Sequence, residues 1–215
     1  MNGRFANASF NTTVALFIVG INHNASVEGE NLIHFEVFKS TIDETLYSFT
    51  DNDYGSTGSS NSLRMNISDD NSCGWQNSFV RMQLNNDPTS STSGFTSILP
   101  DDLRAVMKQI RKYSYSGGQI RQIQDYVCIC SEIEVFGNIT HGPVSEITYQ
   151  KQYEYYASGN SAVHYSIIER TPCDTWLRTI YMDNVNDAFV CIGSNGRVNG
   201  YGASKSLGVS PLIFV

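Results

Sequence analysis

The segment Phe189-Val-Cys-Ile-Gly-Ser-Asn-Gly-Arg-Val-Asn-Gly-Tyr201 carries the clearest structural signal in the chain. Two β-prone runs, residues 189–192 and 197–201, flank Gly193-Ser-Asn-Gly196. An Asn-Gly pair between such runs is typical of a tight hairpin turn. The segment therefore predicts a β-hairpin near the end of the sequence.

Side chains alternate between the two faces of a strand, so the same segment predicts which face is buried. Three apolar residues suit a core: Val190, Ile192 and Val198. In the opposite phase three residues suit solvent: Arg197, Asn199 and Tyr201. We expect the loop 181–187 to lie beside this second set and to form one exposed surface with it.

Further strands are predicted at both ends of the chain. Residues 13–20 form an apolar run that reads as a buried strand, and residues 32–38 alternate, with His34 and Glu36 opposite the apolar set. The polar connection between the two runs predicts a hairpin. Residues 212–215 form a last apolar strand, so we expect strands from both ends of the chain to share one sheet.

The middle of the chain predicts two helices and long loops. Apolar spacing favours a short helix over 74–84 and a longer one over 100–112, whose stripe is buried. Residues 126–136 read as a strand, and residues 148–157 as a short helix or an extended arm. The expected fold is α+β, with mixed or antiparallel sheets in a single domain over residues 1–215.

Composition excludes several classes of function. The 215 residues carry a net charge of -7, and only 16% are charged, against about 25% in ordinary domains. A nucleic-acid binder needs a basic face, so we expect no nucleic-acid partner. The apolar run from Val14 to Ile21 is too short to span a bilayer and lacks a preceding basic stretch, so we expect neither membrane insertion nor a signal peptide.

The polar residues show no recognisable catalytic or metal-binding spacing. Cys128 and Cys130 read as buried apolar positions, and a disulfide stays open for Cys173 and Cys191. The four histidines are scattered, and each reads as a packed or surface residue. Glu132 and Glu134 would share one strand face. We therefore expect no enzyme activity, no cofactor and no required metal.

Several segments resemble, in order and spacing, a family of uncharacterised bacterial and phage domains. They are Gly74-Trp-Gln-Asn-Ser78, Leu99-Pro-Asp-Asp-Leu-Arg-Ala-Val106, Ser131-Glu-Ile-Glu-Val-Phe-Gly137, Gln152-Tyr-Glu-Tyr-Tyr156, Trp176-Leu-Arg178 and Gly208-Val-Ser-Pro211. That family resembles the C-type-lectin-like fold, which formylglycine-generating enzymes also use. Some members are similar to the variable proteins of diversity-generating retroelements, including phage receptor-binding proteins.

The resemblance implies a scaffold and a variable ligand-binding segment within residues 176–215. Trp176, Leu177, Arg178, Gly208, Val209 and Pro211 match fixed positions and belong to the scaffold. Together with the hairpin pattern, the resemblance gives the expected ligand-binding residues as Tyr181, Asp183, Asn184, Asn186, Asp187, Arg197, Asn199, Tyr201, Ser204 and Leu207. The calcium-dependent sugar-binding signatures of true C-type lectins are absent from the sequence, and so is a clear match to the reactive cysteine pair of the formylglycine-generating enzymes.

The expected function is that of a non-enzymatic binding protein, receptor-binding or adhesin-like, with a diversified C-terminal surface. Abundant Tyr, Ser, Gly and Asn independently favour a binding surface, because antibody paratopes use the same residues. The implied ligand is a cell-surface protein or glycan, the implied location a phage tail or bacterial cell surface, and an oligomer stays open. The alternatives are an enzyme related to the formylglycine-generating fold and a structural tail or surface component.

Overall fold

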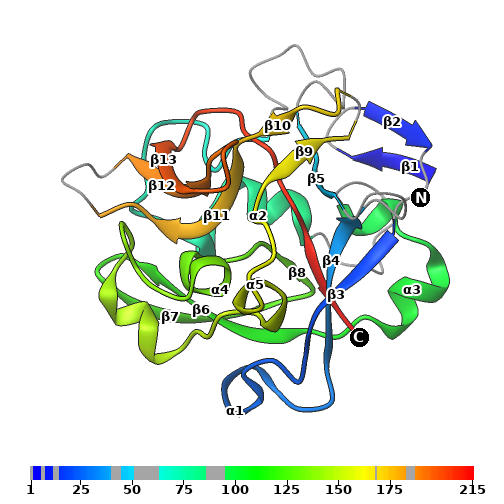
Figure 1. Cartoon of the computed structure of the whole chain (residues 1–215), viewed down its shortest axis with the longest axis horizontal. Helices are drawn as coiled ribbons and strands as arrows, with labels where there is room; N and C mark the ends of the chain where they lie inside the picture. Colours follow the sequence, from blue (N-terminus) through cyan, green and yellow to red (C-terminus); the bar gives the residue numbers. More distant parts are fainter. Residues whose placement is uncertain are drawn as a thin grey trace.

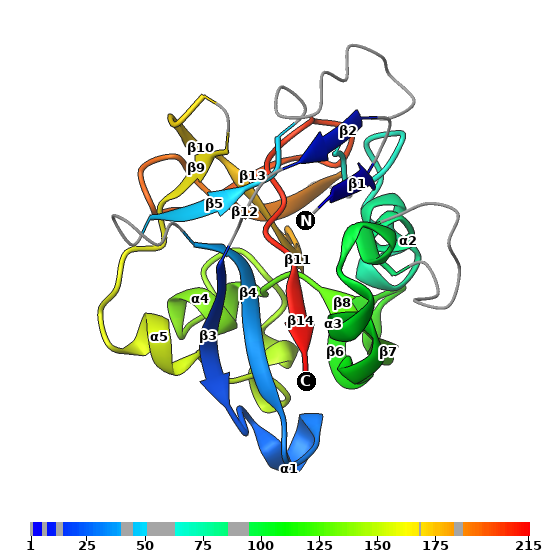
Figure 2. The same ribbon diagram turned by 90° about the vertical axis from the view of Figure 1, so that its right-hand side faces the viewer.

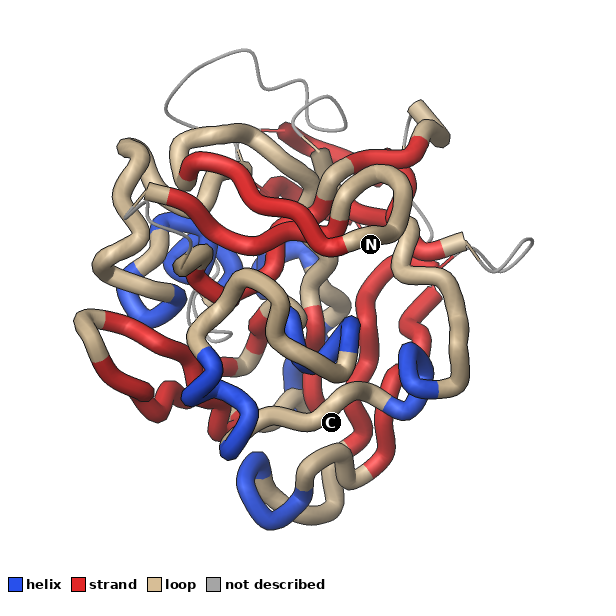
Figure 3. Tube along the Cα trace, turned by 60° about the vertical axis from the view of Figure 1, so that its left-hand side comes forward, coloured by secondary structure: helices blue, strands red, loops and turns tan. Residues whose placement is uncertain are grey.

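The computed structural model describes residues 2–5, 8–11, 15–39, 45–50, 63–85, 95–167, 169–182 and 187–215. Strands in four sheets and several short helices surround a buried core, and much of the chain runs in long connections (Figures 1 and 3). This is the α+β class that the sequence predicts. The predicted loop over 51–62 lies outside the described residues, as does most of the one over 85–97.

The largest sheet joins strands from both ends of the chain (Figure 2). Its order is β10 (Pro172–Cys173), β9 (His164–Ser166), β5 (Leu46–Ser48), β4 (Ile33–Lys39), β14 (Leu212–Phe214) and β8 (Val127–Cys128), with β3 (Ala15–Ile21) paired to β4. Ile213 of β14 lies opposite Phe35 of β4 on one side and Val127 of β8 on the other. The prediction that terminal strands share one sheet is confirmed.

The predicted β3–β4 hairpin is present, but the residues that β4 buries most deeply are polar, while β3 buries Val19. Ile18 and Ile21 of β3 are 45% and 62% exposed, whereas His34 and Glu36 of β4 are 0% and 1% exposed. The expectation that the first strand is buried on both faces is therefore wrong. Among the described strands β3 pairs only with β4, which makes it an edge strand, while His34 and Glu36 meet polar partners inside the molecule.

The C-terminal hairpin forms as predicted. It joins β12 (Ala188–Ile192) to β13 (Val198–Gly202), with Ile192 opposite Val198. Gly196 has a φ of 77°, a backbone conformation that glycine adopts without strain. β11 (Thr175–Ile180) pairs with the other edge of β12, and every residue of β11 and β12 is buried.

The long helix predicted over 100–112 is shorter than expected. α3 (Asp101–Val106) contains no buried residue, and Val106 is 50% exposed. Residues beyond α3 form β6 (Ile110–Ser116), which pairs with β7 (Gln119–Asp125). The turn between the two strands contains Gly117 and Gly118, both with positive φ angles. The alternation of β6 buries Ile110 and Lys112, so strand pairing overrides the helical spacing.

The strand predicted over 126–136 is largely wrong. Only β8 is extended, and it is followed by α4 (Glu132–Phe136). Ser131 and Glu134 form a reciprocal capping box that starts this helix, and Gly137, with a φ of 75°, ends it. The segment predicted as a helix or an arm contains the end of a 3-10 helix, η4 (Val144–Thr148), and α5 (Glu154–Ala157).

The helix predicted over 74–84 is present in two pieces. They are the 3-10 helix η2 (Trp75–Asn77) and α2 (Phe79–Leu84), and Ser78 caps α2 by accepting from the Arg81 N–H. Val80 and Leu84 of α2 are buried, whereas Met82 is 57% exposed. The remaining elements are β1 (Asn2–Phe5), β2 (Ala8–Asn11) and the 3-10 helix η3 (Phe95–Ile98).

All five cysteines are free thiols, so Cys173 and Cys191 form no disulfide. Cys128 and Cys130 are buried, as predicted. Among the described residues no helix has the length and apolar character needed to cross a membrane.

Candidate functional site

The exposed face of the C-terminal hairpin contains part of the predicted binding surface. Arg197 and Asn199 are exposed and Tyr201 is half-buried. Asn199 and Tyr201 share one face of β13, where Asn199 Nδ2 lies 3.5 Å from Tyr201 Oη. The Lys205 ammonium lies 5.6 Å from the centre of the Tyr201 ring. The structure therefore brings these residues together at the surface.

Tyr181 lies elsewhere. Its ring covers Gly200, where an added Cβ would approach Tyr181 Cδ2 to 2.3 Å. Because neighbouring residues of a strand point to opposite faces, Tyr181 lies on the face of β13 that is opposite Tyr201. The Tyr181 ring also stacks on His141, with centroids 4.6 Å apart. The expectation of one surface shared by Tyr181 and Tyr201 is therefore not met.

The other predicted ligand-binding residues are placed as follows. Asp183, Asn184 and Asn186 lie outside the described residues. Asp187 is half-buried and its carbonyl accepts from the Ala203 N–H at 2.7 Å. Ser204 is half-buried, and its N–H donates to Asp69 Oδ1. Leu207 is only 8% exposed and belongs to the core, so its expected place on an open variable surface is wrong.

A surface pocket of about 580 Å³ adjoins the Tyr201 face. It is built by β9, β10 and the connection from β13 to β14, which come together because Thr175 bridges to Gly208. Its lining is rich in hydroxyl and charged groups, and Leu207 contributes part of the wall. The lining residues are Thr50, Ser166, Glu169, Thr171, Pro172, Cys173, Asp174, Ser194, Lys205, Ser206, Leu207 and Gly208.

Asp174 joins the pocket to the hairpin. Its Oδ1 accepts from the Ser194 N–H at 2.7 Å, and its carboxylate raises the pKa of Tyr201. Lys205 lines the same pocket and lies over the Tyr201 ring. Glu169 and Asp174 were not predicted as site residues from the sequence. No motif in residues 166–174 indicates that this segment lies beside the hairpin, because only strand pairing brings the two together.

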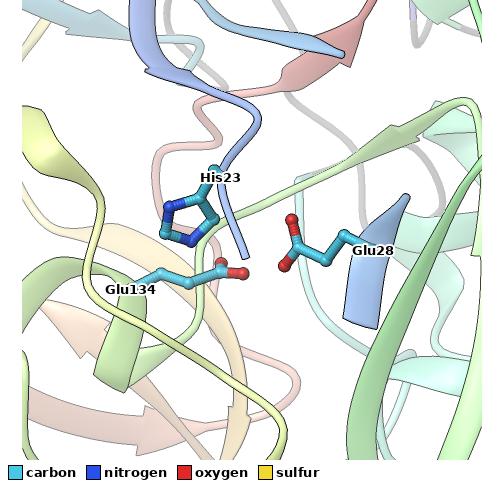
Figure 4. Close-up of side chains that lie close together, drawn as sticks. All are labelled: His23, Glu28 and Glu134. Atoms are coloured by element: carbon cyan, nitrogen blue, oxygen red, sulfur yellow. The ribbon is translucent and has the colours of Figure 1, made fainter. Parts of the chain in front are cut away.

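A second polar site lies inside the molecule (Figure 4). His23, in the β3–β4 connection, Glu28 of α1 (Ala25–Glu28) and Glu134 of α4 are all buried, and each offers a ligand atom within 4.8 Å of the others. Neither ring nitrogen of His23 has a hydrogen-bond partner, and Glu28 Oε2 has none either. These three side chains have the chemistry of a metal-ligand set.

The cation of this cluster is a lysine. Lys112 Nζ donates to Glu134 Oε1 at 2.6 Å, Glu28 Oε1 at 2.8 Å and Tyr153 Oη at 3.0 Å, so all three of its N–H groups are used. A divalent ion bound to the same carboxylates would lie against this ammonium at low dielectric, where like charges repel strongly. The residues present therefore fit an ion-pair network better than a metal centre.

Arg178 completes the network from β11. Its guanidinium makes a bidentate pair with Glu134 and also donates to the Ile129 carbonyl at 2.7 Å. Burial alone would raise the pKa of Glu134, but Arg178 and Lys112 hold that pKa well below its usual range. Burial raises the pKa of Glu28 to about 7, against the pull of Lys112.

The two glutamates predicted to share a strand face have separate roles on α4. Glu134 belongs to the ion-pair network, whereas Glu132 accepts the backbone N–H groups of Thr140, His141 and Gly142. The expectation of packed histidines is confirmed for His23, His34 and His164, which are all buried. The spacing of His23 and His34 gives no sign that both lie against Tyr153.

The residues assigned to the scaffold are buried. Trp176 Nε1 donates to the Leu63 carbonyl, and Arg178 is fully buried. Gly208 leaves no room for a side chain, because an added Cβ would lie 2.8 Å from Ser48 Cβ. These contacts fix β11 and the strand entering β14 around the pocket.

Comparison with known proteins gives one match. No curated protein and no solved structure matches the chain. A family model described as a domain of unknown function, DUF6273, matches residues 39–215, which include the pocket, the hairpin and the Lys112 network except for its β3–β4 part. The chain therefore belongs to the DUF6273 family.

Proposed function

We propose that this chain is a non-enzymatic ligand-binding protein, and that its ligand binds in the pocket beside Tyr201. The observation that carries the proposal is the position of this pocket. Lys205 lines the pocket and lies over the ring of Tyr201 on the hairpin face. On that face Asn199 and Tyr201 present an amide and an aromatic ring, the residue types that adaptable binding surfaces use. Ligand sites combine such a concave surface with a few convergent polar groups.

The lining indicates the chemistry of the ligand. Five hydroxyl side chains, two carboxylates and one ammonium line the pocket, and polar and apolar atoms contribute nearly equal shares of its surface. A ligand there must satisfy many hydrogen bonds, because a desolvated polar group without a partner is costly. A surface glycan, rich in hydroxyl groups, matches this lining better than an apolar peptide. The Tyr201 ring at the rim would cover one face of a sugar.

The polar interior supports the absence of catalysis. His23, Glu28 and Glu134 are sealed from solvent, and so are His164 and Glu36, whose atoms lie 2.7 Å apart. A substrate could not reach either group without opening the fold. Among the described residues, no histidine lines the pocket to serve as a base for one of its hydroxyl groups.

The wider biological setting is proposed from the sequence resemblance. A C-type-lectin-like scaffold would carry the pocket, and a retroelement would diversify the exposed hairpin residues in a phage tail or bacterial surface protein. The placements support diversification at Arg197, Asn199 and Tyr201, which contact solvent, and argue against it at Leu207, which is core. A neighbouring reverse transcriptase gene with a near-copy of the 176–215 coding segment would test this setting.

Binding itself is tested on an immobilised panel of bacterial surface glycans and on whole bacterial cells. We expect the wild type to bind at least one of them, and Tyr201→Ala or Asp174→Asn to weaken that binding by about tenfold, as expected when a central contact is lost. Gln124→Ala, exposed on β7, is the matched control and should bind like the wild type. Unchanged binding by both pocket variants, or none by the wild type, would contradict the proposal.

A further inference from the structure

The connection between β3 and β4, residues 22–32, is held in an unusual backbone conformation. Asn22, Asn24 and Asn31 have positive φ angles of 50°, 47° and 60°. Such angles are uncommon for residues other than glycine and persist only where surrounding contacts impose them. The connection projects from the end of the β3–β4 hairpin, with α1 at its tip (Figures 1 and 2).

Few contacts hold this connection to the rest of the molecule. Asn24 Nδ2 donates to the Tyr149 carbonyl, and Lys108 Nζ donates to the Asn31 carbonyl. Glu28 is the buried residue of α1, and it reaches Lys112 of β6. His23 stacks on Tyr153, with centroids 3.9 Å apart. Three buried side chains, His23, Glu28 and Leu32, therefore anchor the connection inside the protein, and the first two are ionisable.

The cluster around these anchors is balanced only while its histidines are neutral. Two cations, Lys112 and Arg178, face two carboxylates, Glu28 and Glu134. Protonation of His23 and His34 would add two positive charges where burial excludes water. The ionisable groups that face the anchors from all packed elements are His34, Lys112, Glu134, Tyr153, Glu154 and Arg178.

Opening the connection would relieve this charge at little cost to the remaining network. His23 and Glu28 would move into water, and His34 would lose part of its cover. Lys112 would keep Glu134 at 2.6 Å, and Arg178 would keep its bidentate pair with Glu134. The positive φ angles would relax at the same time.

We propose that residues 22–32 form an acid-released latch, which closes over the Lys112–Glu134–Arg178 network at neutral pH and opens when His23 and His34 take up protons. Burial and Lys112 lower the pKa of His23 to about 4 and that of His34 to about 2. Each histidine therefore loses its contribution to the closed form as pH falls below the ordinary value of 6.5.

Glu28 acts in the opposite direction. Burial raises its pKa to about 7, so its contribution to the closed form is present in acid and is lost as pH rises through that value. Two histidines thus favour opening in acid while one carboxylate opposes it. In the closed form neither ring nitrogen of His23, nor Nε2 of His34, has a hydrogen-bond partner that could stabilise an added proton. Because two such histidines outnumber one carboxylate, we expect the net response to acid to be opening.

Hydrogen–deuterium exchange of the intact chain tests the latch. Between about pH 7 and about pH 4.5, after correction for intrinsic exchange, peptides covering 22–32 should lose at least about tenfold in protection, the factor that one pKa unit represents. Peptides covering β12 should not change. His23→Phe keeps a ring on Tyr153 without the charge and should reduce the acid response by about tenfold or more.

His141→Phe is the matched control, because His141 also stacks on a tyrosine but lies outside the cluster. It should leave the acid response intact. The proposal is overturned if residues 22–32 keep their protection in acid, if they lose it in step with β12, or if His23→Phe responds like the wild type. The wild-type measurement decides the matter even if His23→Phe does not fold.

Discussion

The C-terminal hairpin and the Lys112 network satisfy their polar groups in opposite ways. On the hairpin, Arg197 and Asn199 face solvent, and water can replace any protein partner that is lost. In the network, Lys112, Glu134 and Arg178 have side-chain exposures of 1%, 0% and 0%, so each depends on the others. The comparison teaches that one molecule contains a surface that tolerates change and an interior that does not.

The largest expected effect comes from breaking the network at Arg178. Arg178→Met leaves Glu134 without its bidentate partner, and removing one member of a buried ion pair costs about 3–5 kcal/mol. Urea denaturation measures the loss. The double variant Arg178→Met with Glu134→Gln removes both charges and should lose less than the sum of the single variants. A loss below about 1 kcal/mol for Arg178→Met would show that the network adds little to stability.

The next effect lies on the border between the two regions. Leu207 contributes to the pocket wall, but most of its side chain is buried in the core, so Leu207→Ala should lower the free energy of unfolding by about 2–5 kcal/mol. Lys205→Ala, two residues earlier and exposed, should change it by less than about 0.5 kcal/mol. Equal melting curves for the two variants would contradict the assignment of Leu207 to the core.

A third effect depends on pH. Glu146 is completely buried and accepts from the Tyr115 N–H and the Thr179 hydroxyl, and burial raises its pKa to about 7 from 4.5. Its contribution to stability is therefore present below about pH 4.5 and is lost as pH rises through 7. Glu146→Gln removes this dependence. The free energy of unfolding of the variant minus that of the wild type should therefore rise by up to about 3 kcal/mol between pH 4.5 and a pH above 7.

The exposed amide of Gln124 supplies the control for that measurement, because Gln124→Ala changes no titratable group and should leave the dependence on pH as in the wild type. Denaturation midpoints at several pH values give both curves. Parallel curves for Glu146→Gln and the wild type would contradict the assignment.

The smallest expected effect is on the hairpin. Arg197→Ala and Asn199→Ala should each change the free energy of unfolding by less than about 0.5 kcal/mol, because both side chains are exposed. Losses above about 1 kcal/mol at both positions would place them with the interior rather than with the tolerant surface. Thermal denaturation followed by circular dichroism measures the change in the free energy of unfolding of each variant.

Local chemistry explains which elements the sequence predicts well. The hairpin turn at Asn195-Gly196 and the apolar strand over 212–214 depend on neighbouring residues, and both are present. The helix predicted over 100–112 ends early because residues from Ile110 onward form β6 and pair with β7. The apolar spacing of one segment does not show such a pairing. The strand predicted over 126–136 ends early because Ser131 and Glu134 form a capping box that starts α4, and the spacing of the apolar residues there resembles strand alternation.

The candidate site was predicted only where it is continuous in sequence. Asn199 and Tyr201 are neighbours on one strand face, and the alternation found them. Asp174 and Glu169 reach the pocket through the pairing of β9 with β10 and the bridge from Thr175 to Gly208, which no spacing reveals. The cluster of His23, Glu28 and Lys112 likewise requires the packing of α1 on β6.

The place of β14 in the large sheet has a consequence for biosynthesis. β4 is translated before residues 40–211, yet β14, the strand that covers one of its edges, is translated only after them. Until then its backbone groups on that edge have no native partner, and unpaired strand edges in incomplete chains promote association with other chains. Contacts between such distant segments also slow folding. The sheet is therefore completed only after β14 has been translated, and its assembly in cells should depend on protection of the nascent chain until then.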